Sequence, residues 1–132
     1  MAVHATPSEP DKWRYILSLS IAEIEFETLP EHVSICFVGH THDPVIFFAD
    51  GRECGVVPGK SCRVEPSMRY IVNVGSVGQP RDGDARAAYC VYDTDTESVN
   101  IKRVEYAVDE AQKKIRDAGL PEFLAARLSD GR

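Results

Sequence analysis

Two short apolar runs, Val33 to Val38 and Val45 to Ala49, are separated by the polar segment GHTHDP. Continuous apolar runs of this length predict strands that are buried on both faces. The glycine and the proline of the intervening segment predict a sharp connection between them. The chain is therefore expected to fold around a sheet, with His40 and His42 exposed at the end of its strands.

The rest of the chain alternates between strand-like and helix-like patterns. The predicted strands are residues 70–74, 87–93 and 99–106, with short edge strands within 50–70, and the strands at 87–93 and 99–106 form a hairpin. The predicted helices run from Asp11 to Pro30 with a break near residues 18–20, from 108 to 118 before Gly119, and onward from Pro121. These patterns predict an α/β fold that is mostly β, with one domain over residues 1–132.

Composition narrows the class of partner. The chain has 43% hydrophobic and 27% charged residues, which is typical of a globular protein. Its net charge of -6 and pI of about 5.2 argue against nucleic acid or an anionic membrane as partner. There is no apolar run of the roughly 20 residues that a membrane helix needs. We see no signal peptide and expect four reduced cysteines in a cytoplasmic protein.

Three histidines are candidate metal ligands. In a strand, residues two apart point to the same side, so His40 and His42 are expected to aim their imidazoles at one place. His4 ends another strand-like stretch, and strand ends gather at sites in α/β sheets. Neutral imidazole binds Zn, Fe, Ni and Mn. The alternative is that His40 and His42 are polar loop residues that make local hydrogen bonds. His32 follows a proline in a polar loop, and we interpret it as an ordinary exposed histidine.

The segment NVGSVGQPRDGD is the second unusual stretch. Asn73 and Ser76 lie where a strand ends, and the glycines that follow allow backbone N–H groups to line a nest for phosphate. Arg81 would add a charge-assisted contact. The alternative is a glycine-rich turn in which Arg81 pairs with Asp82 or Asp84 in solvent.

Together, GHTH after an apolar strand and the segment NVGSVGQPRDGD resemble the calcineurin-like metallophosphoesterases, in particular their small bacterial and archaeal phosphodiesterase branch. Val3-His4 before a proline-containing turn and LPEFLAARL near the C-terminus also resemble that branch, so the resemblance covers nearly the whole chain. It implies a four-layer α/β/β/α sandwich with two sheets packed face to face. It also implies two divalent metal ions at the strand ends, where they bind the phosphate of the substrate.

Carried over by motif, the resemblance makes His4 and His40 ligands of one metal ion and His42 a ligand of the other. The metals expected are Mn, Fe, Ni or Zn. Asn73, Ser76 and Arg81 lie in the family's neighbouring loop and receive no catalytic role. Val74 stands where the family usually has proline.

The family's first-half motifs Asp-x-His, Gly-Asp-x-x-Asp-Arg and Gly-Asn-His-Asp or -Glu do not occur in this chain. The chain therefore resembles only the C-terminal half of a metallophosphoesterase. We expect a phosphoesterase that acts on phosphate esters only when a complementing N-terminal half or self-association completes its site. Two alternatives stay open: a non-catalytic interaction or regulatory half-domain that pairs through an exposed sheet edge, and a simple metal-binding protein.

Overall fold

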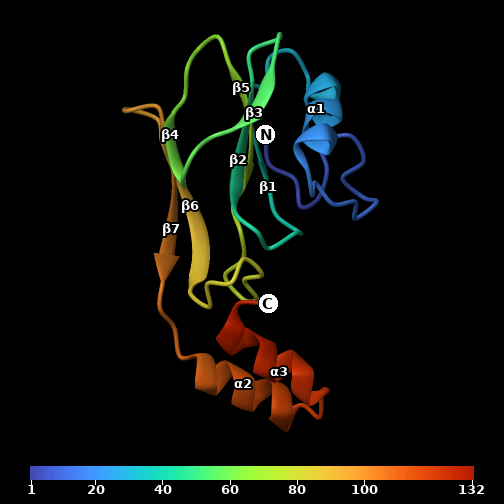
Figure 1. Cartoon of the computed structure of the whole chain (residues 1–132), viewed down its shortest axis with the longest axis vertical. Helices are drawn as coiled ribbons and strands as arrows, with labels where there is room; N and C mark the ends of the chain where they lie inside the picture. Colours follow the sequence, from blue (N-terminus) through green and yellow to red (C-terminus); the bar gives the residue numbers. More distant parts are fainter.

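The computed structural model describes all residues, 1–132, and contains two β-sheets and three helices (Figure 1). In chain order the elements are α1 (Leu19–Thr28), β1 (Ile35–Val38), β2 (Val45–Ala49), β3 (Cys54–Val56), β4 (Ser61–Arg63), β5 (Arg69–Asn73), β6 (Ala87–Asp93), β7 (Ser98–Val104), α2 (Val108–Asp117) and α3 (Glu122–Asp130). None of the helices is long and apolar enough to cross a lipid bilayer.

The larger sheet has the strand order β1-β5-β2-β3, with β1 parallel to β5 and the other neighbours antiparallel. A short N-terminal segment extends this sheet beyond β1, because Ala2 forms a parallel bridge with Phe37. The Val3 N–H donates to the Phe37 carbonyl over 3.0 Å. The continuous apolar runs predicted as buried strands are β1 and β2, and the strand predicted at 70–74 is β5. Residues of all three strands face a core on both sides.

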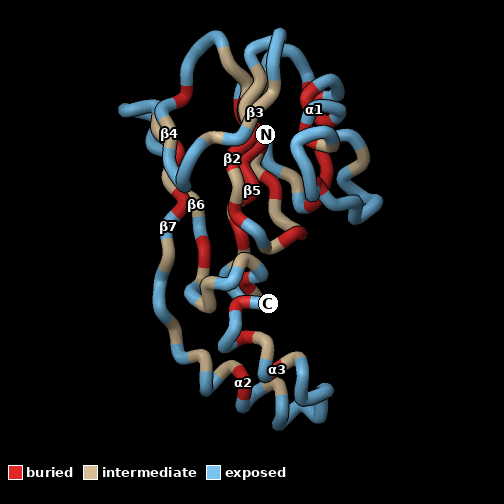
Figure 2. Tube along the Cα trace, in the orientation of Figure 1, coloured by how far each residue is buried: buried red, intermediate tan, exposed pale blue.

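The smaller sheet has the order β4-β7-β6 and is antiparallel throughout. The predicted hairpin is confirmed as β6 and β7. The two sheets pack face to face around one hydrophobic cluster, in which Ile46 and Val72 from the larger sheet are buried together with Val99 and Ile101 from β7. Figure 2 shows the buried residues concentrated along these facing strands.

Helix α1 covers the other face of the larger sheet. Ala22 and Phe26 of α1 are buried against Cys36, Phe47 and Ile71 in a second hydrophobic cluster. The molecule therefore has three layers, with α1 outside, the larger sheet in the middle and the smaller sheet on the far side (Figure 1).

Helices α2 and α3 pack against each other beyond the end of β7 and do not lie over the smaller sheet (Figure 1). The buried Gln112 amide of α2 donates to the Ala125 carbonyl over 3.0 Å and to Ser129 Oγ over 2.7 Å, which fixes the two helices together. The predicted α/β fold with two facing sheets is confirmed, and three layers of the expected four-layer sandwich are formed by these residues.

The helix predicted from Asp11 is wrong in its first half, because α1 begins only at Leu19. Ser18 caps α1, since its side chain accepts a hydrogen bond from the Ile21 N–H. Before the cap, the chain turns at Trp13, whose φ is 55°, and then runs without helical structure. The apolar spacing there has another cause: Ile16 is buried in the core under α1, whereas Leu17 is 72% exposed.

Candidate metal centre

The three predicted ligand histidines lie around one pocket at the end of the larger sheet. His4 follows the N-terminal segment, and His40 and His42 follow β1. All three line a pocket of about 360 Å³. The segment 74–84 after β5, called the second loop here, contributes Gly75 and Ser76 to this pocket. The structure therefore brings together side chains that are up to 38 residues apart in sequence, and their binding of metal stays a prediction.

His4 and His40 converge on one point. His4 Nε2 and His40 Nδ1 are 3.1 Å apart. Two nitrogens bound to one zinc ion at about 2.0–2.1 Å and neighbouring positions would lie about 2.8–3.4 Å apart. His40 Nε2 lies 2.9 Å from the Trp13 carbonyl, which can only accept, so Nε2 carries the proton and Nδ1 presents its lone pair towards His4. The two nitrogens therefore have the spacing of co-ligands. Without a metal ion, His4 Nε2 donates to His40 Nδ1, and binding of a metal ion would require that proton to move to His4 Nδ1.

His42 is oriented by a backbone carbonyl in the same way. Its Nδ1 lies 2.7 Å from the Gln79 carbonyl, so Nδ1 donates and Nε2 keeps a free lone pair. Metal-binding histidines commonly use such a contact to fix their tautomer. Burial lowers the pKa of His42; the bond to Gln79 partly opposes this effect and the nearby Arg81 adds to it. The neutral form, which is the one that binds metal, is therefore favoured.

The loop that carries His40 and His42, residues 39–44, is called the histidine loop here, and its backbone differs from the extended one that we expected. His40 and His42 were predicted to follow one another along an extended strand, but both have left-handed backbones, with φ of 65° and 62°. The imidazoles reach the pocket because the chain kinks at each histidine. Non-glycine residues pay about 1–2 kcal/mol each for this conformation, and it persists only where the surrounding structure holds it.

Asn73 at the end of β5 holds the histidine loop in place. It is 1% exposed, and its amide donates to the Gly39 carbonyl over 2.9 Å and to Thr41 Oγ1 over 2.7 Å. Its carbonyl accepts from the Gly75 N–H over 3.0 Å. Thr41 Oγ1 also accepts from the Asp43 N–H over 3.2 Å. The sequence placed Asn73 beside the site, but the supporting role of Thr41 was missed.

The second loop uses its polar groups internally. Ser76 Oγ accepts from the N–H groups of Gly78 and Gln79 over 3.2 and 2.9 Å. These amides were candidates for the predicted phosphate nest, and this turn already occupies them. The loop therefore acts on the site through Gln79, whose carbonyl orients His42.

Arg81 differs from the alternative predicted for it, and its contact with phosphate stays a prediction. Its guanidinium donates to Gln79 Oε1 over 2.7 and 3.2 Å. The alternative pairing with Asp82 or Asp84 is wrong, because both of these carboxylates contact Arg103 of β7. The Arg81 N–H donates to the backbone carbonyl of His42 over 3.1 Å, so Arg81 connects its own loop to the loop that carries the histidines.

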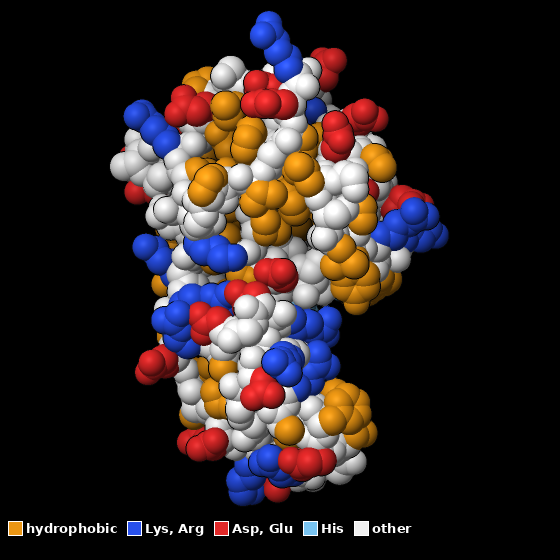
Figure 3. Space-filling view, in the orientation of Figure 1, with side chains coloured by type: hydrophobic (Ala, Val, Ile, Leu, Met, Phe, Trp, Pro, Cys, Tyr) orange, Lys and Arg blue, Asp and Glu red, His pale blue; other side chains and the backbone are white.

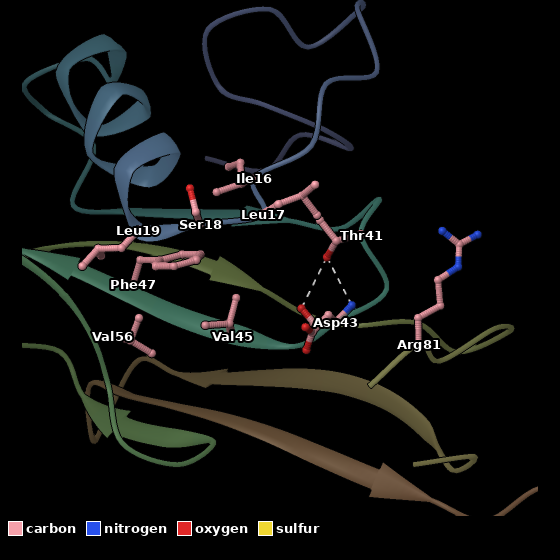
Figure 4. Close-up of a pocket in the computed structure, with 10 residues that line it drawn as sticks. All are labelled: Ile16, Leu17, Ser18, Leu19, Thr41, Asp43, Val45, Phe47, Val56 and Arg81. Carbon is pink, nitrogen blue, oxygen red and sulfur yellow. Dashed lines mark hydrogen bonds between the residues drawn. The ribbon is translucent and has the colours of Figure 1, made fainter. Parts of the chain in front are cut away.

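The side chains that alternate with the histidines line a different pocket. Thr41 and Asp43 contribute to a pocket of about 420 Å³ between α1 and β2. Figure 4 shows its apolar wall, which includes Leu19, Val45 and Phe47, and the dashed hydrogen bonds within the loop. On the molecular face seen in Figure 3, hydrophobic side chains gather over the upper part, with charged side chains around them. The histidine loop thus separates an apolar pocket from the histidine pocket.

The residues present fit part of a metal site. His4 and His40 have the spacing of two ligands, His40 has the tautomer of one, and His42 offers a third imidazole. No group of three or more His, Cys, Asp or Glu side chains is placed to hold a metal ion. Asp43, the nearest acid in sequence, lines the apolar pocket and not the histidine pocket. The donor set therefore lacks carboxylates.

Gly75 is expected to be the loop position that is least tolerant of a side chain. Its φ is 78°, and an added Cβ would lie 2.7 Å from the Ala88 Cβ and 3.2 Å from the Pro44 Cβ. Gly75→Ala should therefore lower the free energy of unfolding by about 2–4 kcal/mol, as strain and overpacking add. The measurement is urea unfolding, with Gly78→Ala as control because nothing lies within 4 Å of a Cβ there. Equal stability of the two variants would contradict this expectation.

Comparison with known proteins identifies the class of protein that the chain resembles. The crystal structure of a metallophosphoesterase from Sphaerobacter thermophilus matches 99% of this chain with 40% identity and a TM-score of 0.86, and the match covers 54% of that protein. The predicted resemblance to metallophosphoesterases is therefore confirmed: the chain has the fold of about half of such a protein. No protein-family model matches the chain.

Two further proteins are similar over nearly the whole chain. The uncharacterized protein MJ0912 of Methanocaldococcus jannaschii is 36% identical over 129 residues, which are 98% of this chain and 50% of that protein. The hypothetical protein PH1004 from Pyrococcus horikoshii OT3 shares the fold, with a TM-score of 0.71 and 22% identity over 99% of this chain and 46% of that one. The chain thus spans about half the length of the relatives it matches.

Proposed function

We propose that this chain supplies the histidine-bearing, C-terminal half of a metal-dependent phosphoesterase that hydrolyses phosphodiesters or phosphomonoesters. The observation that carries the proposal is the 3.1 Å approach of His4 Nε2 to His40 Nδ1, with the tautomer of His40 fixed by a carbonyl. It occurs in a chain that resembles a metallophosphoesterase at 40% identity. The rest of the site would come from a complementing N-terminal half.

The residues of this chain have separate roles in the proposed site. His4 and His40 would hold one divalent ion and His42 the other, with Mn, Fe, Ni or Zn as the candidates. When bound, two such ions polarise the phosphoryl oxygens and neutralise the charge that develops during hydrolysis. The carbonyls of Trp13 and Gln79 keep the imidazoles of His40 and His42 turned towards the pocket.

Charge explains why the chain alone is expected to be inactive. Three neutral imidazoles bring no negative charge to a site that must hold two dications. The complementing half must therefore contribute carboxylates, which both bind the ions and offset their charge. On this account the histidines position the metal ions, and the carboxylates of the complementing half neutralise the charge of these ions.

The test is to join the chain to the segment of the Sphaerobacter protein that it does not match, and to assay hydrolysis of bis(p-nitrophenyl) phosphate with Mn²⁺. We expect turnover by the fusion that a chelator abolishes, and none by the chain alone. Lys113→Ala should leave turnover unchanged, because Lys113 is an exposed residue of α2 that lines none of the pockets near the histidines. A fusion that unfolds cooperatively and binds Mn²⁺ but hydrolyses nothing would contradict the proposal and favour the non-catalytic half-domain.

A further inference from the structure

One side of the two-sheet sandwich is open, between the N-terminal segment and β6. Three adjoining pockets lie along it, and neighbouring pockets share lining residues, including Phe37 in all three. The middle pocket is almost entirely apolar, and the last one contains the three histidines. We define this surface, the open side, by Met1, Ala2, Phe37, Val77, Tyr89 and Tyr92. It is therefore a continuous trough that is most apolar in its middle and ends at the candidate metal centre.

The larger sheet ends at this side with unpaired backbone groups. The Phe37 N–H donates to the Met1 carbonyl, and the Phe37 carbonyl accepts from the Val3 N–H, both over 3.0 Å. In this parallel pattern the N–H and C=O of the intervening Ala2 point away from β1. They face the open side, where a further strand would pair with them.

The smaller sheet ends at the same side with a second unpaired edge. The Ala88 N–H of β6 donates to the Ser76 carbonyl over 2.8 Å and so points away from β7. Backbone groups alternate in direction along an antiparallel strand, so those of Cys90 and Tyr92 also point away from β7. No loop covers them as Ser76 covers Ala88, and these two residues form a free strand edge.

The side chains of the open side are unusually apolar for a surface. Val77 is 70% exposed, and Tyr89 and Tyr92 are 42% and 36% exposed. The rings of Phe37 and Tyr92, one from each sheet, lie 6.1 Å apart at the mouth of the sandwich. An apolar trough flanked by two free strand edges is a surface that proteins cover by pairing with another segment.

We propose that the open side is the docking surface for the complementing half, which adds one strand to each sheet and places its carboxylates at the histidines. The chain spans only 50–54% of the relatives' length, so a segment of similar size is available to cover it. No Asp or Glu lines any of the three pockets, so a second copy docked through this same surface would bring histidines and no acids. Only the delivery of carboxylates rests on the proposed function; the docking itself rests on the edges.

The test is co-expression of the full chain with the unmatched segment of the Sphaerobacter protein, followed by purification and hydrogen exchange. We expect a one-to-one complex in which the amides of Cys90 and Tyr92 exchange at least tenfold more slowly than in the free chain. Val77→Arg should weaken the complex at least tenfold by placing a charge in the trough. Tyr92→Pro should do the same by removing a free N–H, without taking a hydrogen bond from β7. The matched control is Leu120→Arg, at a site that is 50% exposed and far from the open side.

The docking proposal is overturned by the absence of a complex, by a complex that leaves the strand edge unprotected, or by a dimer of the chain. No complex at micromolar concentration, or a complex in which the Cys90 and Tyr92 amides still exchange freely, would mean that the segment does not pair here. A stable dimer of the chain that protects the same amides would assign the surface to a second copy. His40→Ala separates this inference from the proposed function, because it should abolish hydrolysis and leave the complex intact. A complex without hydrolysis would therefore contradict the proposed function alone.

Discussion

Replacing His40 with alanine in the completed protein is expected to lower phosphodiester turnover by about 10³-fold, since several kcal/mol of metal-derived transition-state stabilisation would be lost. The affinity for Mn²⁺ should fall by more than about 100-fold, because even loss of a partner that only orients a ligand costs 10- to 100-fold. His40 is singled out because it joins His4 on one side and the Trp13 carbonyl on the other. Steady-state hydrolysis and isothermal titration with Mn²⁺ measure the two effects.

The control for this prediction is Lys113→Ala, which shortens an exposed side chain of α2 and should change neither quantity. Removing His40 should also relieve a left-handed backbone only slightly, because alanine is strained at a φ of 65° as well. Stability is therefore expected to change little. Full activity and unchanged Mn²⁺ affinity in His40→Ala would remove the histidine pair from the site.

Replacing Asn73 with alanine is expected to lower the free energy of unfolding by about 2–4 kcal/mol, because three hydrogen bonds of a buried amide are lost and their partners stay buried. Those partners are the Gly39 carbonyl, Thr41 Oγ1 and the Gly75 N–H. The same bonds hold the kinked loop, so Mn²⁺ affinity of the completed protein should fall as well, by 10- to 100-fold.

Asn100→Ala is the control for Asn73→Ala, because Asn100 is only half-buried and its side chain makes one hydrogen bond, to Ser98 Oγ over 3.1 Å. It should cost about 1 kcal/mol or less in urea unfolding. A similar cost at both positions would mean that Asn73 does not act as the support of the histidine loop. Lost stability with full metal affinity would show that the loop keeps its shape without it.

Strands β1 and β2 were predictable because their apolar runs reflect burial on both faces. The runs at 33–38 and 45–49 became β1 and β2, and the segments at 87–93 and 99–106 became the hairpin of β6 and β7. The end of α2 was also predictable from a local signal, because Gly119, with a φ of 69°, follows the C-cap residue Ala118. In each case the signal lies within a few residues of the element that it predicts.

Residues 11–18 were not predictable from local pattern. Ile16 contacts the core under α1, while Trp13 and Tyr15 lie against the His40 ring. These contacts imitate the spacing of a helix face, although no helix forms there. The partner of Trp13 and Tyr15 is His40, which lies 27 residues from Trp13, so the sequence of the segment alone does not reveal it.

The gathering of the three histidines was predictable, and the groups that support them were not; their binding of metal stays a prediction. His4, His40 and His42 stood out as side chains at strand ends. The groups that orient His40 and His42 are backbone carbonyls of Trp13 and Gln79, and every residue type has a carbonyl. The left-handed kinks likewise depend on Asn73, which reaches them from 32 to 34 residues away. Their origin is tertiary, and a motif cannot show it.

The most direct test of the central claim is an anomalous difference map from crystals of the chain completed by the Sphaerobacter segment and grown with Mn²⁺. The account predicts one Mn²⁺ peak between His4 Nε2 and His40 Nδ1, and a second beside His42 Nε2. Ions bound only by residues of the added segment, with His4 and His40 still hydrogen-bonded to each other, would contradict it.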